Sequence, residues 1–206
     1  MKIGTLLSIL AVTLMLAIAS GSAVAQNVGD SSDYFVTYFA NNIAAAPDAT
    51  VRFVNDGEST VNRDGILYAS IYVFNDSQEL TECCSCPVTA DGILSESVRN
   101  QLTTNPITGV KPPRGVIKVI SSTTESDVNT GFAPNTPAPG LRGWATHIQS
   151  VANKYPYGPA AYSQTETRFA DANLTSGEQG TLQLLCYYDN QLSGLPCPCT
   201  VEDYDF

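Results

Sequence analysis

Alternating apolar and polar positions recur along this chain, and they predict a protein built mainly of β-strands. The strongest such segment is ILYASIYVF at residues 66–74, which lies between the turn signals Asp64-Gly65 and Asn75-Asp76. β-Branched and aromatic residues dominate these segments, as is typical of strands. The predicted strands cover residues 32–39, 50–54, 66–74, 115–120, 141–151 and 166–170.

One segment near the C-terminus has the period of a long amphipathic helix. Thr175 and Glu178 have the spacing of a capping box, in which each side chain accepts a hydrogen bond from the other residue's backbone N–H. Gly194 suits the residue that ends such a helix. The predicted buried stripe consists of Leu182, Leu185, Cys186 and Leu192.

A shorter helix and a long loop are predicted between the strands. Leu94, Val98 and Leu102 follow one another at intervals of four, which indicates two helical turns over residues 95–102. Residues 121–140 are rich in Ser, Thr, Asn, Pro and Gly, so we expect a long exposed loop there. Such a loop can separate two domains, but the cysteines beyond it need partners upstream. We therefore expect one domain with a long excursion.

Residues 1–25 have the features of a signal peptide. Lys2 precedes an apolar run that ends in Ala23-Val24-Ala25, whose small side chains are typical of a cleavage site. A membrane anchor needs a longer apolar core with basic residues beyond it, and this segment has neither. We expect residues 26–206 to form a single secreted or periplasmic domain with no membrane span after cleavage.

The charge of the chain limits its partners. It has 20 acidic and 10 basic residues, for a formal net charge of −10 at pH 7. A negative surface repels phosphate backbones and anionic lipids, so binding to nucleic acid or to an anionic membrane is disfavoured. The same charge favours solubility.

The six cysteines form two clusters of three that lie far apart in the sequence. In an exported chain disulfides are expected, whereas the same spacing in a reducing compartment indicates zinc. Because each cluster has an odd number of cysteines, complete pairing requires at least one bridge between the clusters. Either one or three such bridges are possible, so the connectivity stays open. Cys83 and Cys84 are disfavoured as a pair because their Cα atoms are only about 3.8 Å apart. The clusters are Cys83, Cys84 and Cys86, and Cys186, Cys197 and Cys199.

Together these patterns predict a mainly β fold. We expect an antiparallel β-sandwich of about seven or eight strands with one C-terminal α-helix, stapled by disulfides.

Recognisable catalytic motifs are absent from the sequence. The one histidine, His147, lies inside a predicted strand, and no nucleophile elbow, metalloprotease motif or phosphate-binding loop occurs. Cys83 and Cys86 have the C-x-x-C spacing of a thiol oxidoreductase. That motif opens a helix, however, whereas strands and turns are expected here. A protein that is not an enzyme is therefore favoured.

The string ECCSCPV at residues 82–88, with a later Cys-x(10)-Cys-x-Cys, resembles a group of uncharacterised secreted bacterial proteins. The resemblance covers the cysteine regions and the strands beside them. Because that group has no assigned activity, the resemblance implies export and cysteine pairing only.

Two functional classes remain. We favour a non-enzymatic structural or interaction protein of the cell surface, the matrix or an extracellular filament, associating with itself or with a surface glycan. A filament can use residues 32–39 to complete a neighbour's sheet, although a strand of the domain's own sheet is the favoured interpretation. The alternative is a secreted carbohydrate-binding module or polysaccharide-active enzyme. Its sugar-stacking residues would be Trp144, Tyr155, Tyr157 and Tyr162.

No motif requires a cofactor, and calcium is the metal whose ligands the sequence offers. Calcium prefers oxygen donors on loops. Acidic and amide side chains gather at residues 55–58, 189–190 and 202–205, none of them in an EF-hand pattern.

Overall fold

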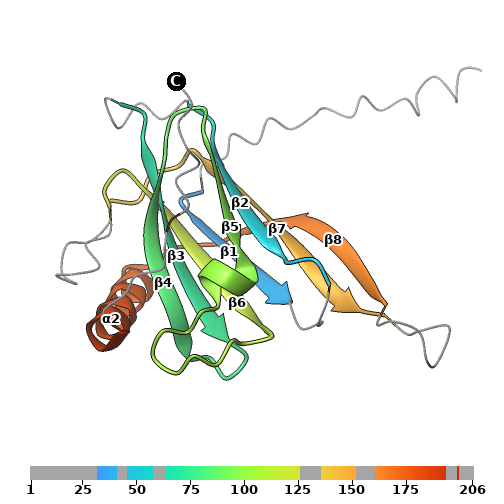
Figure 1. The fold of residues 1–206 in the computed structure, drawn as a ribbon. Helices are drawn as coiled ribbons and strands as arrows, with labels where there is room; N and C mark the ends of the chain where they lie inside the picture. Colours follow the sequence, from blue (N-terminus) through green and yellow to red (C-terminus); the bar gives the residue numbers. More distant parts are fainter. Residues whose placement is uncertain are drawn as a thin grey trace, which may run out of the picture.

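A computed structural model places the chain in two antiparallel sheets and a helix, and it describes residues 32–40, 46–57, 64–125, 136–151, 161–193 and 199. Two sheets packed face to face, with a C-terminal helix, confirm the predicted mainly β, sandwich-like fold (Figure 1). The elements are β1 (Tyr34–Ala40), β2 (Thr50–Asn55), β3 (Leu67–Asn75), β4 (Leu80–Val88), β5 (Ile93–Ser97), η1 (Val98–Leu102), β6 (Arg114–Ser122), β7 (Leu141–Ser150), β8 (Tyr162–Arg168), β9 (Ala170–Asp171) and α2 (Ser176–Ser193).

Sheet A has the strand order β4-β3-β6-β1-β9, and sheet B has the order β5-β2-β7-β8. Successive side chains of a strand point to opposite faces. In β2, Val51 and Phe53 are fully buried between the sheets, whereas Arg52 between them is partly exposed. The core between the sheets is formed by such inward positions, among them Phe35, Phe39, Phe53, Leu67, Ile71, Ile117 and Leu141.

The N-terminal strand belongs to its own domain. All seven residues of β1 pair with β6, from Tyr34 opposite Ile120 to Ala40 opposite Arg114. This agrees with the favoured interpretation of residues 32–39.

Strands β4 and β5 and the helical turn η1 differ from the sequence prediction. The first cysteine cluster lies inside strand β4, which no alternation indicated. Thr81 through Cys86 are all buried, because one face of β4 packs in the core and the other lies under α2. The helix predicted over residues 95–102 is wrong for its first half, since residues 95–97 belong to β5 and only η1, a single π-helical turn, follows.

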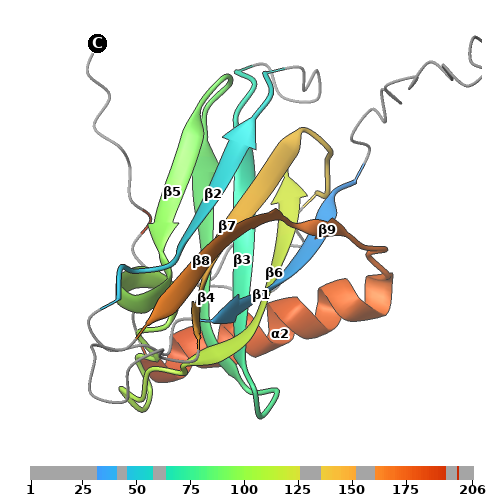
Figure 2. The ribbon, with the colours of Figure 1, turned by 90° about the vertical axis from the view of Figure 1, so that its right-hand side faces the viewer.

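One stretch of chain joins the two sheets. β8 pairs with β7 in sheet B, and after Phe169 the chain continues as β9, which pairs with β1 in sheet A (Figure 2). Phe169 is buried against Phe53, with ring centroids 5.3 Å apart. A Cβ atom at Gly143 would lie 2.9 Å from the Phe169 ring, so glycine is needed there.

Helix α2 covers the outer face of sheet A and packs chiefly against β4 (Figure 2). The backbone N–H of Glu178 donates to Thr175 Oγ1 over 3.1 Å, as half of the capping box requires. The Glu178 carboxylate instead accepts from Lys118 Nζ at 2.5 Å and from the Tyr34 hydroxyl at 2.9 Å. The hydrogen bond from Lys118 lowers the pKa of Glu178, so an ionised carboxylate ties the start of the helix to sheet A.

The predicted apolar stripe of the helix is only partly correct. Leu182 and Cys186 are buried, but Leu185 is 38% exposed and Leu192 74%. The buried face continues through Asp189 and Asn190 instead.

Disulfides join β4 to the C-terminal region, as predicted. Cys83 is bonded to Cys186 and Cys86 to Cys199, with Cα atoms 5.7 Å and 5.4 Å apart. Cys84 is also in a disulfide. Cys197 lies outside the described residues.

Non-reducing peptide mapping is expected to find three cross-links between the clusters. Cys83 and Cys86 use Cys186 and Cys199, so Cys197 is the cysteine of the sequence that remains for Cys84. Chymotrypsin can cleave after Tyr187 or Tyr188 and separate the later cysteines. The 83–86 segment should then remain joined to a Cys186 fragment and to a Cys197–Cys199 fragment. A bridge within either cluster would contradict this pairing.

Several predicted features lie outside the described residues, namely the signal peptide at residues 1–25, Gly194, and residues 126–135 of the loop predicted at 121–140. Ser121 and Ser122 do not belong to that loop, because they are buried residues of β6. Among the described helices, none combines the length and the apolar character that crossing a bilayer requires.

Candidate functional site

The two sheets differ in what covers their outer faces. α2 lies on sheet A, and within the described residues no helix lies on the outer face of sheet B (Figures 1 and 2). Among the side chains on this side, Glu166 and Arg168 are exposed and Arg52 and Trp144 are partly exposed, whereas Thr146 is buried. We call this surface the outer face of sheet B.

Three residues form a row across this face. The register places Arg52 of β2 opposite Trp144 of β7, and Trp144 opposite Arg168 of β8. Directly paired residues of antiparallel strands project to the same side, with Cβ atoms about 4.5–5.5 Å apart. The half-buried Trp144 thus lies between two arginines in the register of the sheet.

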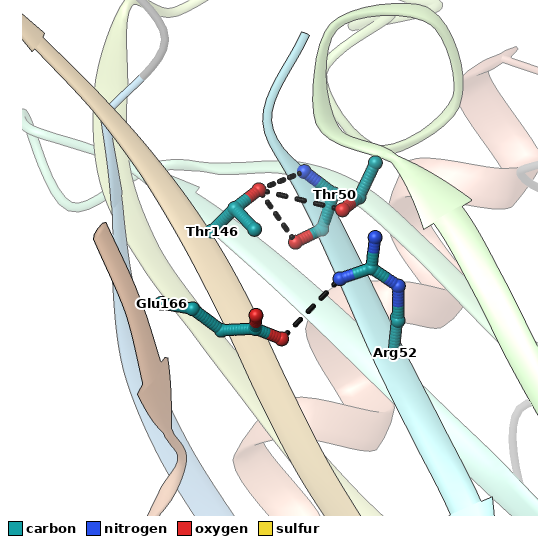
Figure 3. A network of polar contacts seen from close by, with 4 residues as sticks. All are labelled: Thr50, Arg52, Thr146 and Glu166. Carbon is teal, nitrogen blue, oxygen red and sulfur yellow. Dashed lines mark hydrogen bonds and ion pairs between the residues drawn. The ribbon is translucent and has the colours of Figure 1, made fainter. Parts of the chain in front are cut away.

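A polar network holds the strands that carry this row. Thr146 Oγ1 accepts from the backbone N–H of Thr50 at 2.6 Å and lies 3.3 Å from the Thr50 hydroxyl (Figure 3). Beside it, Arg52 Nη1 lies 3.3 Å from Glu166 Oε1, so the two side chains reach across β7 above the sheet (Figure 3). The threonines link β2 to β7 two residues away from Arg52 and Trp144.

The ion pair on this face is weak. The Arg52 and Glu166 side chains are 38% and 51% exposed, and pairs in such surroundings contribute about 0–1 kcal/mol. Arg142, which pairs by register with Val54, lies 3.6 Å from Asp56 in a similar contact. An external carboxylate can replace the partner of either arginine at little cost in free energy.

Basic residues are concentrated here. Arg52, Arg142 and Arg168 are three of the ten basic residues in a chain of net charge −10. Arginine binds carboxylates in a bidentate geometry and stacks on aromatic rings. Alternation in TVRFV and LRGWATH places Arg52 and Arg142 out of phase with Val51, Phe53 and Leu141, a signal that the sequence prediction did not use. The proximity of the arginines depends on the register of the strands.

Of the four predicted sugar-stacking residues, only Trp144 lies in this row. Tyr162 is 42% exposed at the start of β8, opposite Ser150. Six residues of β7 separate Ser150 from Trp144, which is roughly 20 Å along the strand. Tyr155 and Tyr157 lie outside the described residues. Trp144 and Tyr162 are therefore well separated along β7 and β8, and the four-residue stacking surface stays a prediction.

His147 does not form part of a surface site. Its ring is fully buried, stacks on Tyr38 with centroids 4.0 Å apart, and places Nε2 2.7 Å from the Thr167 hydroxyl. Burial lowers the pKa of His147, which favours the neutral ring. Its Nδ1 is buried without a hydrogen-bond partner, so the described residues provide no group that orients a hydroxyl–imidazole pair for catalysis.

A hollow of about 440 Å³ lies elsewhere, between the end of β1, the β3–β4 turn and the start of β6. Its charged lining residues, Arg114 and Asp76, are paired with each other at 2.9 Å. The rest of its lining is largely apolar, so it offers binding volume and little chemistry.

Metal ligands are sparse in the described part of the chain. There, no three His, Cys, Asp or Glu side chains lie together in a group that could hold a metal ion. The predicted calcium ligands at residues 202–205, and residue 58 of the first segment, lie outside this part.

Comparison with known proteins adds no relative, since no protein-family model, no curated protein and no solved structure matches this chain.

Proposed function

We propose that this chain is a non-enzymatic interaction protein, exported from the cytoplasm, that binds an acidic polysaccharide through the outer face of sheet B. The observation that supports the proposal is the row of Arg52, Trp144 and Arg168 across three strands. Disulfide bonds and the signal-like N-terminus are compatible with this location.

The row fits the chemistry of a uronic-acid chain. A sugar ring presents C–H groups that pack on the flat face of an indole, while its carboxylates accept from guanidinium groups. An arginine is paired with Trp144 on either side in the register, so successive acidic sugars can be held along the row. Because the rest of the protein is negatively charged, positive side chains gathered on one face favour an acidic ligand at that face.

A role as a structural protein belongs to the same class. Its filament version has weaker support, because β1 is paired along its whole length within its own chain. A polysaccharide-active enzyme also has weaker support, since the one described histidine is buried between the sheets and no acidic pair lies beside Trp144.

Replacement of Trp144 by alanine is expected to weaken binding to polygalacturonate or alginate by about tenfold, which corresponds to about 1.4 kcal/mol of lost stacking. The double variant Arg52→Ala, Arg168→Ala should lose affinity further, and its remaining binding should depend less on salt. Isothermal titration with oligosaccharides of defined length measures both effects.

Arg114→Ala is the matched control, because Arg114 is an exposed, ion-paired arginine outside sheet B. Its affinity should equal that of the wild type, and neutral dextran should not bind. Unchanged affinity in the Trp144 variant, with its circular dichroism spectrum preserved, would refute the proposal.

A further inference from the structure

Strand β8 forms an open edge of sheet B. It pairs with β7 on one side and ends the strand order β5-β2-β7-β8, so no other strand of the described residues lies along its second side (Figure 1). Residues 164–168 are all exposed, although successive side chains of a strand point to opposite faces. Thr165 and Thr167 are thus exposed even on the face turned toward sheet A, which means that β8 extends beyond the cover of that sheet.

The other sheet edges are shorter or carry features that block pairing. β9 is two residues long, and β5 is five residues long and continues directly into η1. β4 contains Pro87, and disulfides tie it to the C-terminal region. Short length, proline and lysine are the usual means of protecting an edge strand. β8 is seven residues long and has neither proline nor lysine, so it is the edge best suited to accept another strand.

The sequence of β8 is complementary to itself in one antiparallel register. When two copies of the strand pair about Thr165, this residue lies on a twofold axis opposite Thr165 of the second copy. Ser163 then lies opposite Thr167 of the second copy on the same face of the sheet. Directly opposed threonine and serine side chains form favourable cross-strand hydrogen bonds.

The charges of β8 favour the same register. On the outer face, Gln164 lies opposite Glu166 of the second copy, and Tyr162 lies opposite Arg168, a pair that allows a cation to stack on an aromatic ring. A shift of two residues in one direction brings Glu166 opposite Glu166 of the second copy, where like charges are destabilising. A shift in the other direction removes the last two residues of β8 from the pairing. The register centred on Thr165 pairs the whole strand without opposing like charges.

We propose that two copies of this chain associate through β8, in antiparallel pairing centred on Thr165. The two four-stranded sheets B then form one continuous sheet across a closed twofold interface. Directly paired residues project to the same side, so the outer faces of both sheets B lie on one side of the dimer. This self-association goes beyond polysaccharide binding by a single copy, because a chain that reaches both outer faces gains affinity from the second contact.

The test is sedimentation velocity of the mature, oxidised protein over a range of concentrations, without polysaccharide. A pair of seven-residue strands is smaller than a standard interface, so a Kd on the order of 10⁻⁵–10⁻⁴ M is expected for the dimer. Thr165→Glu and Thr165→Lys each bring like charges together on the twofold axis, and each should raise Kd by about tenfold or more. An equimolar mixture of the two variants brings opposite charges together and should restore the dimer.

Thr181→Glu and Thr181→Lys are the matched controls, because Thr181 is an exposed threonine of α2. Both should dimerise as the wild type does, and weaker association of either would place the contact on α2 and overturn the proposal. A monomeric wild type, or a mixture of the Thr165 variants that associates no better than each alone, would overturn it as well. So would fibres in electron micrographs, since head-to-tail pairing of β8 with β5 does not close. No polysaccharide is present in these measurements, so their result is independent of ligand binding.

Discussion

The double variant Cys83→Ala, Cys186→Ala is expected to lose about 3 kcal/mol of unfolding free energy, rather than the roughly 4.7 kcal/mol that a bridge closing about 100 residues provides. The reason is that the bridges join the same two segments. With Cys86–Cys199 and the expected Cys84–Cys197 bridge in place, Cys83–Cys186 closes only the residues between 83 and 84 and between 186 and 197. That loop is roughly 12 residues long, for which the chain-entropy model gives about 3 kcal/mol.

Urea unfolding under non-reducing conditions, followed by circular dichroism, measures this loss. The variant Cys86→Ala, Cys199→Ala is the comparison. With the other two bridges in place, Cys86–Cys199 closes only the residues between 84 and 86 and between 197 and 199, a loop of roughly four residues, so the expected loss is smaller, about 2 kcal/mol. The contribution of the long loop should disappear only after full reduction. A loss near 5 kcal/mol from one bridge alone would show that the others do not hold the two segments together.

Between about pH 4.5 and 7, in EDTA, the unfolding free energy is expected to fall by about 3 kcal/mol as pH rises. Burial raises the pKa of Glu82 from 4.5 to about 7, and burial raises that of Asp189 from 3.8 to about 6. The folded state therefore holds protons that the unfolded state has released, so stability decreases through this window and levels off only near pH 8, where Glu82 is ionised in the folded state.

His147 changes the unfolding free energy with pH in the opposite direction. Its pKa is lowered by burial, so its part of the stability rises with pH up to its usual value of about 6.5. The difference between wild type and Asp189→Asn cancels this contribution. The variant should be more stable than wild type at pH 8 in EDTA and about equal to it at pH 4 to 5. Urea unfolding across this pH range measures the difference, and a variant less stable at pH 8 would contradict the assignment.

The sandwich could be predicted because most of its strands have one apolar face. Residues 32–39 and 50–54 alternate, and β1 and β2 begin within two residues of the predicted bounds. β4 could not be found in this way, because its cysteines, Thr81 and Glu82 are buried on both faces. Alternation disappears wherever a strand is covered on each side.

The buried face of the helix and the neighbours of Trp144 could not be predicted fully, because both depend on contacts between segments that are far apart in the sequence. Leu182 and Cys186 were correctly placed, but Asp189 and Asn190 follow them at helical spacing and were not assigned to the buried face because they are polar. Trp144 was singled out from its residue type alone. Its neighbours Arg52 and Arg168 come from strands whose register is set by the whole sheet.

The strand that passes from sheet B to sheet A has a consequence for the order of folding. β1, among the first described residues, has β9 as its second neighbour, more than 130 residues later. During synthesis, one backbone edge of β1 stays open until nearly the whole domain has been made. Contacts of such high sequence separation make folding slow, and an unpaired edge at that stage is exposed to aggregation. The pairing of Phe35 and Val36 with β9 therefore has to wait until Ala170 and Asp171 have been made.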